Sequence, residues 1–436
     1  MTSFIARREQ WVRRLRSAAR SKLGGNIVSL YLVQGLNYLL PLVILPYLLR
    51  VLGPRNYGTI VFAQSLMRYG VIVADFGFTL SATRAISLVR HQPDDVAKIF
   101  WSTIVARVAL LLLSAAIIWP IAEFIPILRA NLELTASCGL LVVGAVLFPQ
   151  WYFQGLERMR VIALIYLLVR VISLIAIFAF VRSPADDLAA AIILSGQQVI
   201  AAIISLGAIQ WIAPLKFFRP RMQDVVEALR SSWHLFLANA AGSLYLNSNA
   251  FLLGIFAGPN AVAIYSLANR IALAIFNLMA PIVQAVYPRA SLLFSQSTAL
   301  AFVFVKRIFK FVGPAAIALS ALSWVFAPWM VNVLGGHQYI GATPILRIMS
   351  VLPAALTLAS FLAQIVMINV GLARALSKIY LVIGLLNLIL MPPLVSWYGA
   401  SGAALSLVIV EIIGPLLMLN TIRRSGIMKN PPVSAV

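Results

Sequence analysis

The sequence consists of apolar runs about 20 residues long that alternate with short polar segments. About 20 apolar residues in a helix cross the hydrocarbon core of a bilayer, so each run predicts a membrane span. The run from Val108 to Pro120 lacks the polar alternation of membrane barrel strands, which favours helices. We therefore predict an all-α, polytopic membrane protein with twelve transmembrane helices. The predicted spans are 25–49, 57–80, 97–120, 134–153, 161–182, 187–212, 232–256, 261–287, 309–334, 342–369, 376–397 and 400–422.

The composition agrees with a chain that lies mostly in lipid and lacks a catalytic centre. Of the 436 residues, 62% are hydrophobic and 11% are charged, whereas about a quarter are charged in soluble domains. The single cysteine, Cys138, excludes an intrachain disulfide, and His91, His234 and His337 are widely separated. The sequence contains no P-loop and no D-x-D arrangement. We predict no enzyme activity, no metal and no cofactor, with energy from a proton or sodium gradient, the membrane potential or the substrate gradient.

The formal net charge of +22 follows the predicted topology. Most of the 34 lysines and arginines lie before span one, after the even-numbered spans or in the tail. The intervening loops hold only Arg50, Arg55, Arg129 and Arg182. Cytoplasmic loops carry such a basic excess, so both termini are predicted to be cytoplasmic. The charge needs no nucleic-acid partner. The first residues are either an amphipathic helix on anionic lipid or a frayed basic tail.

The two halves of the chain resemble each other. Gly53-Pro54 opens span two, and Gly258-Pro259 opens span eight, 205 residues later. Two further matches follow at the same spacing: Ala63-Gln64 with Ala268-Asn269, and Arg84-Ala85 with Arg289-Ala290. After spans four and ten, GLER (155–158) resembles GLAR (371–374) at a spacing of 216. Six spans per half imply parallel repeats with a ligand cavity between them.

The repeat predicts two pseudo-repeated six-helix lobes and three shorter segments. The predicted order is a cytoplasmic basic segment 1–24, an N-lobe 25–212, a cytoplasmic linker 213–231, a C-lobe 232–422 and a cytoplasmic tail 423–436.

Charged residues within the predicted spans indicate a hydrated cavity. Each costs about 3 kcal/mol to insert at the centre of a membrane helix, so it needs water or a partner. The basic residues are Arg68, Arg107, Arg170, Arg270 and Arg347, and the acids are Asp75 and Glu411. Because arginines outnumber acids, the cavity suits an anion. Arginine binds phosphate through paired hydrogen bonds, so a diphosphate is the predicted ligand.

Helical spacing groups polar residues with these charges. Successive residues advance about 100° around a helix, so residues seven apart share one face. The residues predicted to contact diphosphate or sugar in the cavity are Arg68, Arg107, Arg170, Arg270, Gln64, Asn277, Gln284, Asn239 and Asn247. Asp75 and Glu411 are predicted to couple transport to a proton or sodium ion.

Each of these residues also has a structural interpretation. Arg347 lies near a span end, where arginines commonly extend to the interface, and this is its preferred interpretation. Arg107 and Arg170 lie near the midplane and either bind ligand or contact backbone carbonyls and acids. Asp75 either neutralises an arginine or carries a proton. Glu411 either bonds a neighbouring helix or couples an ion, and the amide and hydroxyl stripes are also typical of helix packing.

Three local motifs resemble those of a known transporter family. They are Leu52–Gly58 (LGPRNYG), Asp75–Phe78 (DFGF) with Ala82–Ser87 (ATRAIS), and Trp151–Glu157 (WYFQGLE). The likeness is to Wzx-type flippases, in the polysaccharide transporter family of the multidrug/oligosaccharidyl-lipid/polysaccharide exporter superfamily. It extends over essentially the whole chain but supplies no catalytic residue.

The resemblance implies a MATE-like or MurJ-like bundle that flips undecaprenyl-diphosphate-linked oligosaccharides to the periplasmic leaflet by alternating access. O-antigen or exopolysaccharide biosynthesis would be the pathway, and the bacterial inner membrane the location. The implied partners are the lipid-linked oligosaccharide, membrane lipids and the polysaccharide polymerase machinery. The alternatives are a multidrug or cation exporter, a membrane-bound glycan-assembly enzyme and a scaffold in a polymerase complex. A cation exporter would need acids where this chain has arginines.

Overall fold

The computed structural model describes residues 22–212 and 214–425, with side chains for all of these except 22–42, 212, 238, 239, 241–247 and 280. Within this part of the chain every regular element is a helix and no strand occurs. Ten of the helical segments are long and apolar enough to cross a membrane. The predicted all-α membrane fold is therefore confirmed.

Spans one and seven are not separate segments among the ten, because many of their side chains lie outside those that the structure describes. Two long helices, each bent into a hairpin, contain them. Helix α2 (Lys22–Asp75) contains predicted span one and most of span two and reverses at Gly53, whose φ is 72°. Helix α11 (Met222–Asn277) contains span seven and most of span eight and reverses at Gly258, whose φ is 78°. Only glycine adopts this left-handed conformation without steric cost, which explains the repeated Gly-Pro pairs.

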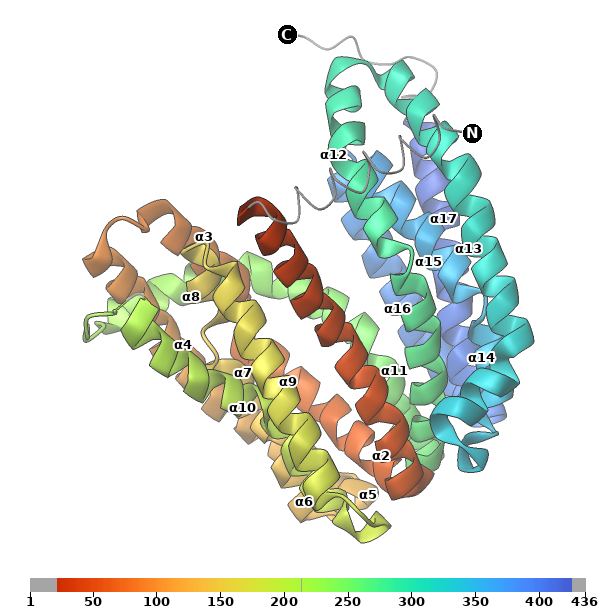
Figure 1. The fold of residues 1–436 in the computed structure, drawn as a ribbon, viewed down its shortest axis with the longest axis horizontal. Helices are drawn as coiled ribbons and strands as arrows, with labels where there is room; N and C mark the ends of the chain where they lie inside the picture. The colour runs from red at the N-terminus through yellow and green to blue at the C-terminus, as the bar shows by residue number, and fades with distance from the viewer. Residues whose placement is uncertain (1–21, 213, 426–436) are drawn as a thin grey trace, which may run out of the picture.

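The remaining helices form two groups. Figure 1 shows the two groups splayed apart at one end, with the hairpins α2 and α11 between them. The first group contains α3 (Phe78–Val89), α4 (Pro93–Phe124), α5 (Pro126–Arg129), α6 (Leu132–Cys138), α7 (Leu140–Leu147), α8 (Gln150–Gly155), α9 (Met159–Phe180), η1 (Pro184–Asp186) and α10 (Asp187–Ile212). The second contains α12 (Ala280–Gln296), α13 (Thr298–Gly335), η2 (His337–Tyr339), α14 (Ala342–Met349), α15 (Leu352–Ser360), the π-helix η3 (Phe361–Met367), α16 (Ala373–Tyr398) and α17 (Ala400–Arg424).

The hairpins meet near their Gly-Pro turns and hold the two groups together there. Gly58 on α2 packs against the Pro259 carbonyl of α11, and Gly254 packs against the Phe62 ring. The contacts are so close that a Cβ atom at either glycine would overlap its neighbour. The hairpin turns thus form a closed end, and the helices of the two groups lie farther apart at the opposite end (Figure 1).

The predicted repeat is present in the structure, but one of its registers is wrong. After α8, Arg158 N donates to Phe153 O over 2.8 Å, and after η3, Leu372 N donates to Met367 O over 2.9 Å. These equivalent helix-ending bonds lie 214 residues apart, not 216. The preceding residue has a positive φ in both loops, 58° at Glu157 and 77° at Gly371. Backbone geometry therefore pairs Glu157 with Gly371, and the GLER and GLAR match is offset by two residues.

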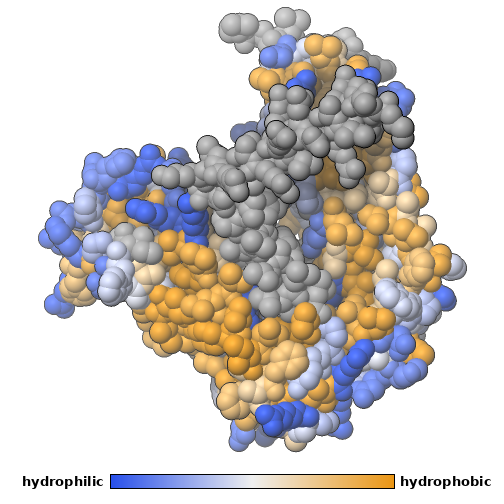
Figure 2. Space-filling view, in the orientation of Figure 1, coloured by the Kyte–Doolittle hydropathy of each residue, from blue (hydrophilic) through white to orange (hydrophobic). Residues whose placement is uncertain are grey.

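The surface carries the apolar band expected of a membrane protein. On the face in Figure 2, apolar residues cover the middle of both groups and polar residues gather toward their ends. Leu112, Phe311 and Ile389 are each more than two-thirds exposed. Many large apolar side chains are exposed on helices long enough to span a membrane. This is expected when lipid surrounds the helices.

Candidate functional site

Two adjoining cavities lie between α2, α11 and the two groups. The first encloses about 210 Å³ and the second about 530 Å³. Gln64 and Arg68 of α2 and Arg270 of α11 line both cavities, which therefore form one chamber. The second half of each hairpin supplies these residues, so the repeat itself brings them together.

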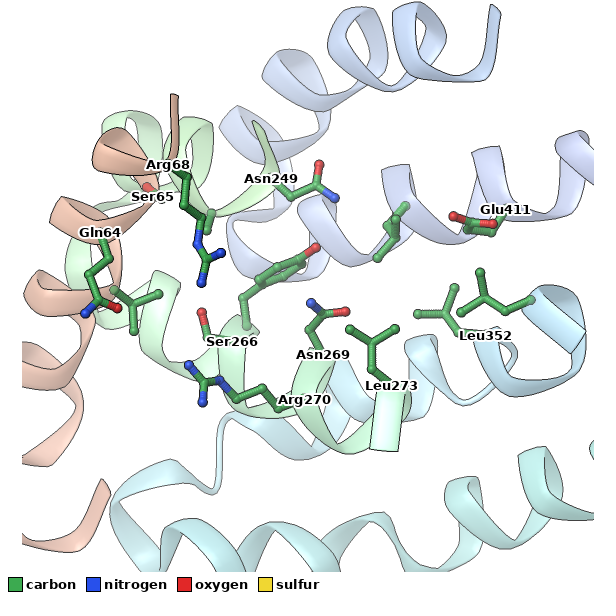
Figure 3. Close-up of a pocket in the computed structure, with 15 residues that line it drawn as sticks. Gln64, Ser65, Arg68, Asn249, Ser266, Asn269, Arg270, Leu273, Leu352 and Glu411 are labelled. Carbon is green, nitrogen blue, oxygen red and sulfur yellow. The ribbon is translucent and has the colours of Figure 1, made fainter. Parts of the chain in front are cut away.

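Arg68 and Arg270 are the main charged feature of the chamber. Their guanidinium groups point toward each other across Ser266 (Figure 3). Both side chains are exposed to the chamber, and neither has an ion pair or hydrogen bond to another described residue. Two like charges in a confined space repel each other, and an anion between them relieves that repulsion. The arrangement is suited to a phosphate-bearing ligand.

Polar side chains extend the chamber in both directions. Toward the first group, Gln64 Nε2 donates to Ser195 Oγ over 3.0 Å, and Arg170 lines the larger cavity. Toward the second group, the smaller cavity is lined by Asn249 and by Glu411, which is 9% exposed. Three arginines and one acid thus line the chamber. It carries the excess of positive charge that the sequence predicts.

A third cavity of about 250 Å³ continues from the chamber into the first group. It shares Val71, Ile72, Ala145 and Gln198 with the larger chamber cavity. Arg107 and Asp75 line it and form an ion pair. Arg107 Nη2 lies 3.0 Å from Asp75 Oδ1 and donates to Ala145 O over 2.9 Å. The Arg107 charge is therefore compensated locally, unlike those of the two facing arginines.

The predicted site residues separate into three sets. Gln64, Arg68, Arg170, Arg270 and Glu411 line the chamber, whereas Asp75 and Arg107 line the third cavity. Asn277 and Gln284 are exposed and line none of these three cavities. The side chains of Asn239 and Asn247 lie outside those that the structure describes.

Arg347 lies outside the three cavities and contacts an aromatic ring. Its guanidinium carbon lies 5.1 Å from the centre of the Trp324 ring, and its side chain is exposed. A cation over an indole face is stabilised without any acid. This contact explains Arg347 without a ligand.

Sequence reasoning missed several polar residues of the chamber, including Asn249, Ser266 and Asn269. Asn387 Nδ2 donates to Asn249 Oδ1 over 2.7 Å, and Ser406 Oγ donates to Asn387 Oδ1 over 2.9 Å. The repeat held a signal for one of them, because Asn269 is the counterpart of Gln64 at the 205-residue spacing. Among the residues that the structure describes, no group of histidine, cysteine and acidic side chains is arranged to bind a metal.

The chain resembles transporters in both sequence and fold. Residues 23–294, more than half of the chain, match the family described as polysaccharide biosynthesis protein. A protein of Escherichia coli K12 named "Putative O-antigen transporter" is 31% identical, over 92% of this chain and 97% of its own. A Shigella dysenteriae protein of the same name is 28% identical, over 91% and 99%.

Two solved structures share the fold. The lipid II flippase MurJ, in an inward closed conformation, matches with a TM-score of 0.69 and 13% identity, over 91% of this chain and 87% of its own. An inward-facing multidrug resistance MATE transporter of the MOP superfamily matches with a TM-score of 0.64 and 16% identity, over 91% and 96%. The family and these neighbours indicate a transporter rather than an enzyme. The chain is a multi-pass membrane protein that belongs to the polysaccharide biosynthesis protein family, as a Wzx-type polysaccharide transporter of the MOP superfamily.

Proposed function

We propose that this transporter flips undecaprenyl-diphosphate-linked oligosaccharide repeat units from the cytoplasmic to the periplasmic leaflet. The observation that carries the proposal is the facing pair Arg68 and Arg270, which have no partner among the described residues. A diphosphate supplies the negative charge that this pair lacks. Its lipid tail stays in the bilayer, and the product serves O-antigen or exopolysaccharide synthesis.

Alternating access supplies the movement in this proposal. The helices of the two groups are joined at the hairpin turns and lie farther apart at the other end, an arrangement that supports a change between two conformations. The proposed moving bodies are an N-lobe 25–212 and a C-lobe 232–422, with the linker 213–231 between them. In this proposal both termini, within 1–24 and 423–436, lie in the cytoplasm, which the basic flanking segments support. Reporter fusions after Arg182 and Arg424 should then give periplasmic and cytoplasmic signals, respectively.

Ion coupling is assigned to Glu411 in this proposal. Asp75 compensates Arg107 over 3.0 Å, which supports its structural interpretation. Glu411 lines the same cavity as the facing arginines, so its charge and theirs act on each other and on a bound anion. Proton or sodium binding at Glu411 is then linked to ligand binding, because both change the charge of one chamber. The polysaccharide polymerase is the proposed protein partner downstream.

Substitution of the facing arginines tests this function. In a strain that lacks the gene, Arg68→Ala or Arg270→Ala should abolish surface polysaccharide while membrane levels of the protein stay unchanged. Arg347→Ala is the matched control, because this arginine lies outside the cavities. The deletion strain should accumulate the lipid-linked oligosaccharide, whose identification names the substrate. Normal polymer with both chamber variants would overturn the proposal.

The alternative of a multidrug exporter shares the fold of the MATE neighbour but not the expected charge. A cationic drug would meet three arginines and one acid in the chamber. Efflux of a cationic dye that depends on this protein, without any change in surface polysaccharide, would favour that alternative.

A further inference from the structure

The third cavity differs from the chamber in its size. It extends from α2 toward α4, α8 and α10 and holds about 250 Å³, less than the 300–1,000 Å³ or so of a pocket for a drug-sized ligand. It has room for one ring-sized group of a longer substrate. Since it shares Val71, Ile72 and Gln198 with the chamber, such a group remains connected to whatever the chamber holds.

Two buried residues that line this cavity have N–H groups without a hydrogen-bond acceptor. Nε and Nη1 of Arg107 and Nε1 of Trp151 have no hydrogen-bond partner in the described part of the chain. Arg107 is 3% exposed and Trp151 is fully buried, and both line the cavity. Buried donors are almost always satisfied in proteins, because an unmet one is costly. Three of them beside one cavity therefore indicate a ligand that offers acceptor oxygens.

The charge of the cavity excludes a second phosphate site. Asp75 neutralises Arg107, so the charged pair that lines the cavity has no net charge. Amides from Gln150 and Gln198 and the rings of Phe148 and Trp151 complete much of the lining. Amides, an ion pair and aromatic surface suit a neutral ligand with several hydroxyl or carbonyl groups. A sugar ring has this chemistry.

Building on the proposed function, we propose that the third cavity is the subsite for a neutral sugar of the lipid-linked oligosaccharide. Arg68 and Arg270 hold the diphosphate, and the sugar extends toward Arg107 and Trp151. The seven residues from Arg68 to Asp75 on α2 span about 10 Å, which separates the two subsites along one substrate. The N–H groups of Arg107 and Trp151 donate to sugar oxygens, and Gln150 and Gln198 frame the ring.

The test measures what a sugar adds to binding. The probes are farnesyl diphosphate alone and farnesyl diphosphate carrying glucose, galactose or N-acetylglucosamine, with the full chain purified in detergent. The wild type should bind at least one sugar-bearing probe more tightly than the bare diphosphate. Arg107→Lys keeps the charge opposite Asp75 but removes the two unmet donors, and Trp151→Phe removes the third. Each change should weaken the sugar-bearing probe about two- to tenfold, the effect of lost hydrogen bonds, and leave the bare probe unchanged.

The controls separate this proposal from the function on which it rests. Arg68→Ala should weaken all probes, whereas Arg347→Lys should affect none. Unchanged binding of the bare diphosphate by Arg107→Lys and Trp151→Phe shows that the fold is kept. The sugar subsite is wrong if the wild type binds the bare diphosphate with the same affinity as every sugar-bearing probe. It is also wrong if both variants still bind the sugar-bearing probe more tightly. In either case the proposed function stands. If no probe binds, the proposed function fails as well.

Discussion

Arginines within the predicted membrane spans have their charge stabilised in three different ways. Arg107 pairs with an acid, Arg347 lies over an aromatic ring, and Arg68 and Arg270 face each other across a chamber. Each solution keeps the guanidinium out of bare hydrocarbon, where it would be unstable. The facing pair gains from binding an anion. Its residues therefore carry the functional argument.

Helical spacing predicted part of the site because it fixes the face of a residue but not its depth. By spacing, Gln64, Arg68 and Asp75 share one arc of α2, yet Asp75 lies in the third cavity, since seven residues rise about 10 Å. Asn277 and Gln284 follow Arg270 at seven-residue spacing but line none of the three cavities. Helix α11 ends at Asn277, so the break before α12 changes the face of Gln284.

The buried ion pair should be sensitive to loss of either partner. Arg107→Ala leaves the Asp75 carboxylate, whose side chain is only 21% exposed, without its counter-charge. We expect a loss of about 3 kcal/mol, the lower end of the range for breaking a buried pair. The thermal unfolding midpoint in detergent should fall clearly. Replacing both residues by leucine should restore much of the loss, and equal midpoints for Arg107→Ala and the wild type would show that the pair contributes nothing.

At the scale of elements, the two hairpins determine how the groups meet. The Gly-Pro turns of α2 and α11 were predictable from the repeat, but their mutual contact was not. Gly58 against Pro259 and Gly254 against Phe62 are contacts between distant parts of the chain, and local spacing carries no information about them. In the structure, the repeated Gly-Pro turns form the closed end of the transporter.

A methyl group at this contact should open the closed end. Gly58→Ala places a Cβ atom against the Pro259 carbonyl, and rigid backbone cannot move aside as a side chain can. We expect spin labels on Arg55 and Asn260, at the two exposed turns, to move apart, and transport to fall. Gly207→Ala is the matched control, because nothing lies within 4 Å of its added Cβ. An unchanged label distance in Gly58→Ala would contradict the role of this contact.

The first turns of α11 are attached to the first group by an ion pair, at the end opposite the hairpin turns. Lys98 Nζ lies 2.8 Å from Asp224 Oδ1, and Asp224 Oδ2 accepts from Arg221 N over 2.9 Å. The hydrogen bond from Lys98, followed by that from Arg221, lowers the pKa of Asp224 below its ordinary value. A lowered pKa contributes stability that is present above the unfolded value of about 3.9 and lost as pH falls through the folded one.

Attachment of these turns should therefore withstand mild acid. Hydrogen exchange of residues 222–232, corrected for its intrinsic pH dependence, should be constant between about pH 8 and 5 and rise only below about pH 4. Asp224→Asn removes the charge and should raise exchange over the whole range. Loosening of the wild type between pH 7 and 5 would show that another group controls the attachment.

At the scale of the whole molecule, the fold was more predictable than the site. Apolar runs of spanning length, basic alternation and the internal repeat led to a two-part helical membrane protein before any contact was known. The size of the chamber and of the neutral third cavity depends on how several helices approach each other in space. Sequence periodicity does not contain that information, and so Asn249 and Ser266 were found only in the structure.

Translocation by the purified protein tests the central claim most directly. Proteoliposomes are loaded with undecaprenyl-diphosphate-linked oligosaccharide, and the fraction that an external glycosidase can reach is followed over time. The wild type should make the inner-leaflet pool accessible, whereas Arg68→Ala and Arg270→Ala should behave like protein-free vesicles and Arg347→Ala like the wild type. Equal translocation by the wild type and both chamber variants, or none above protein-free vesicles for the wild type, would contradict the account.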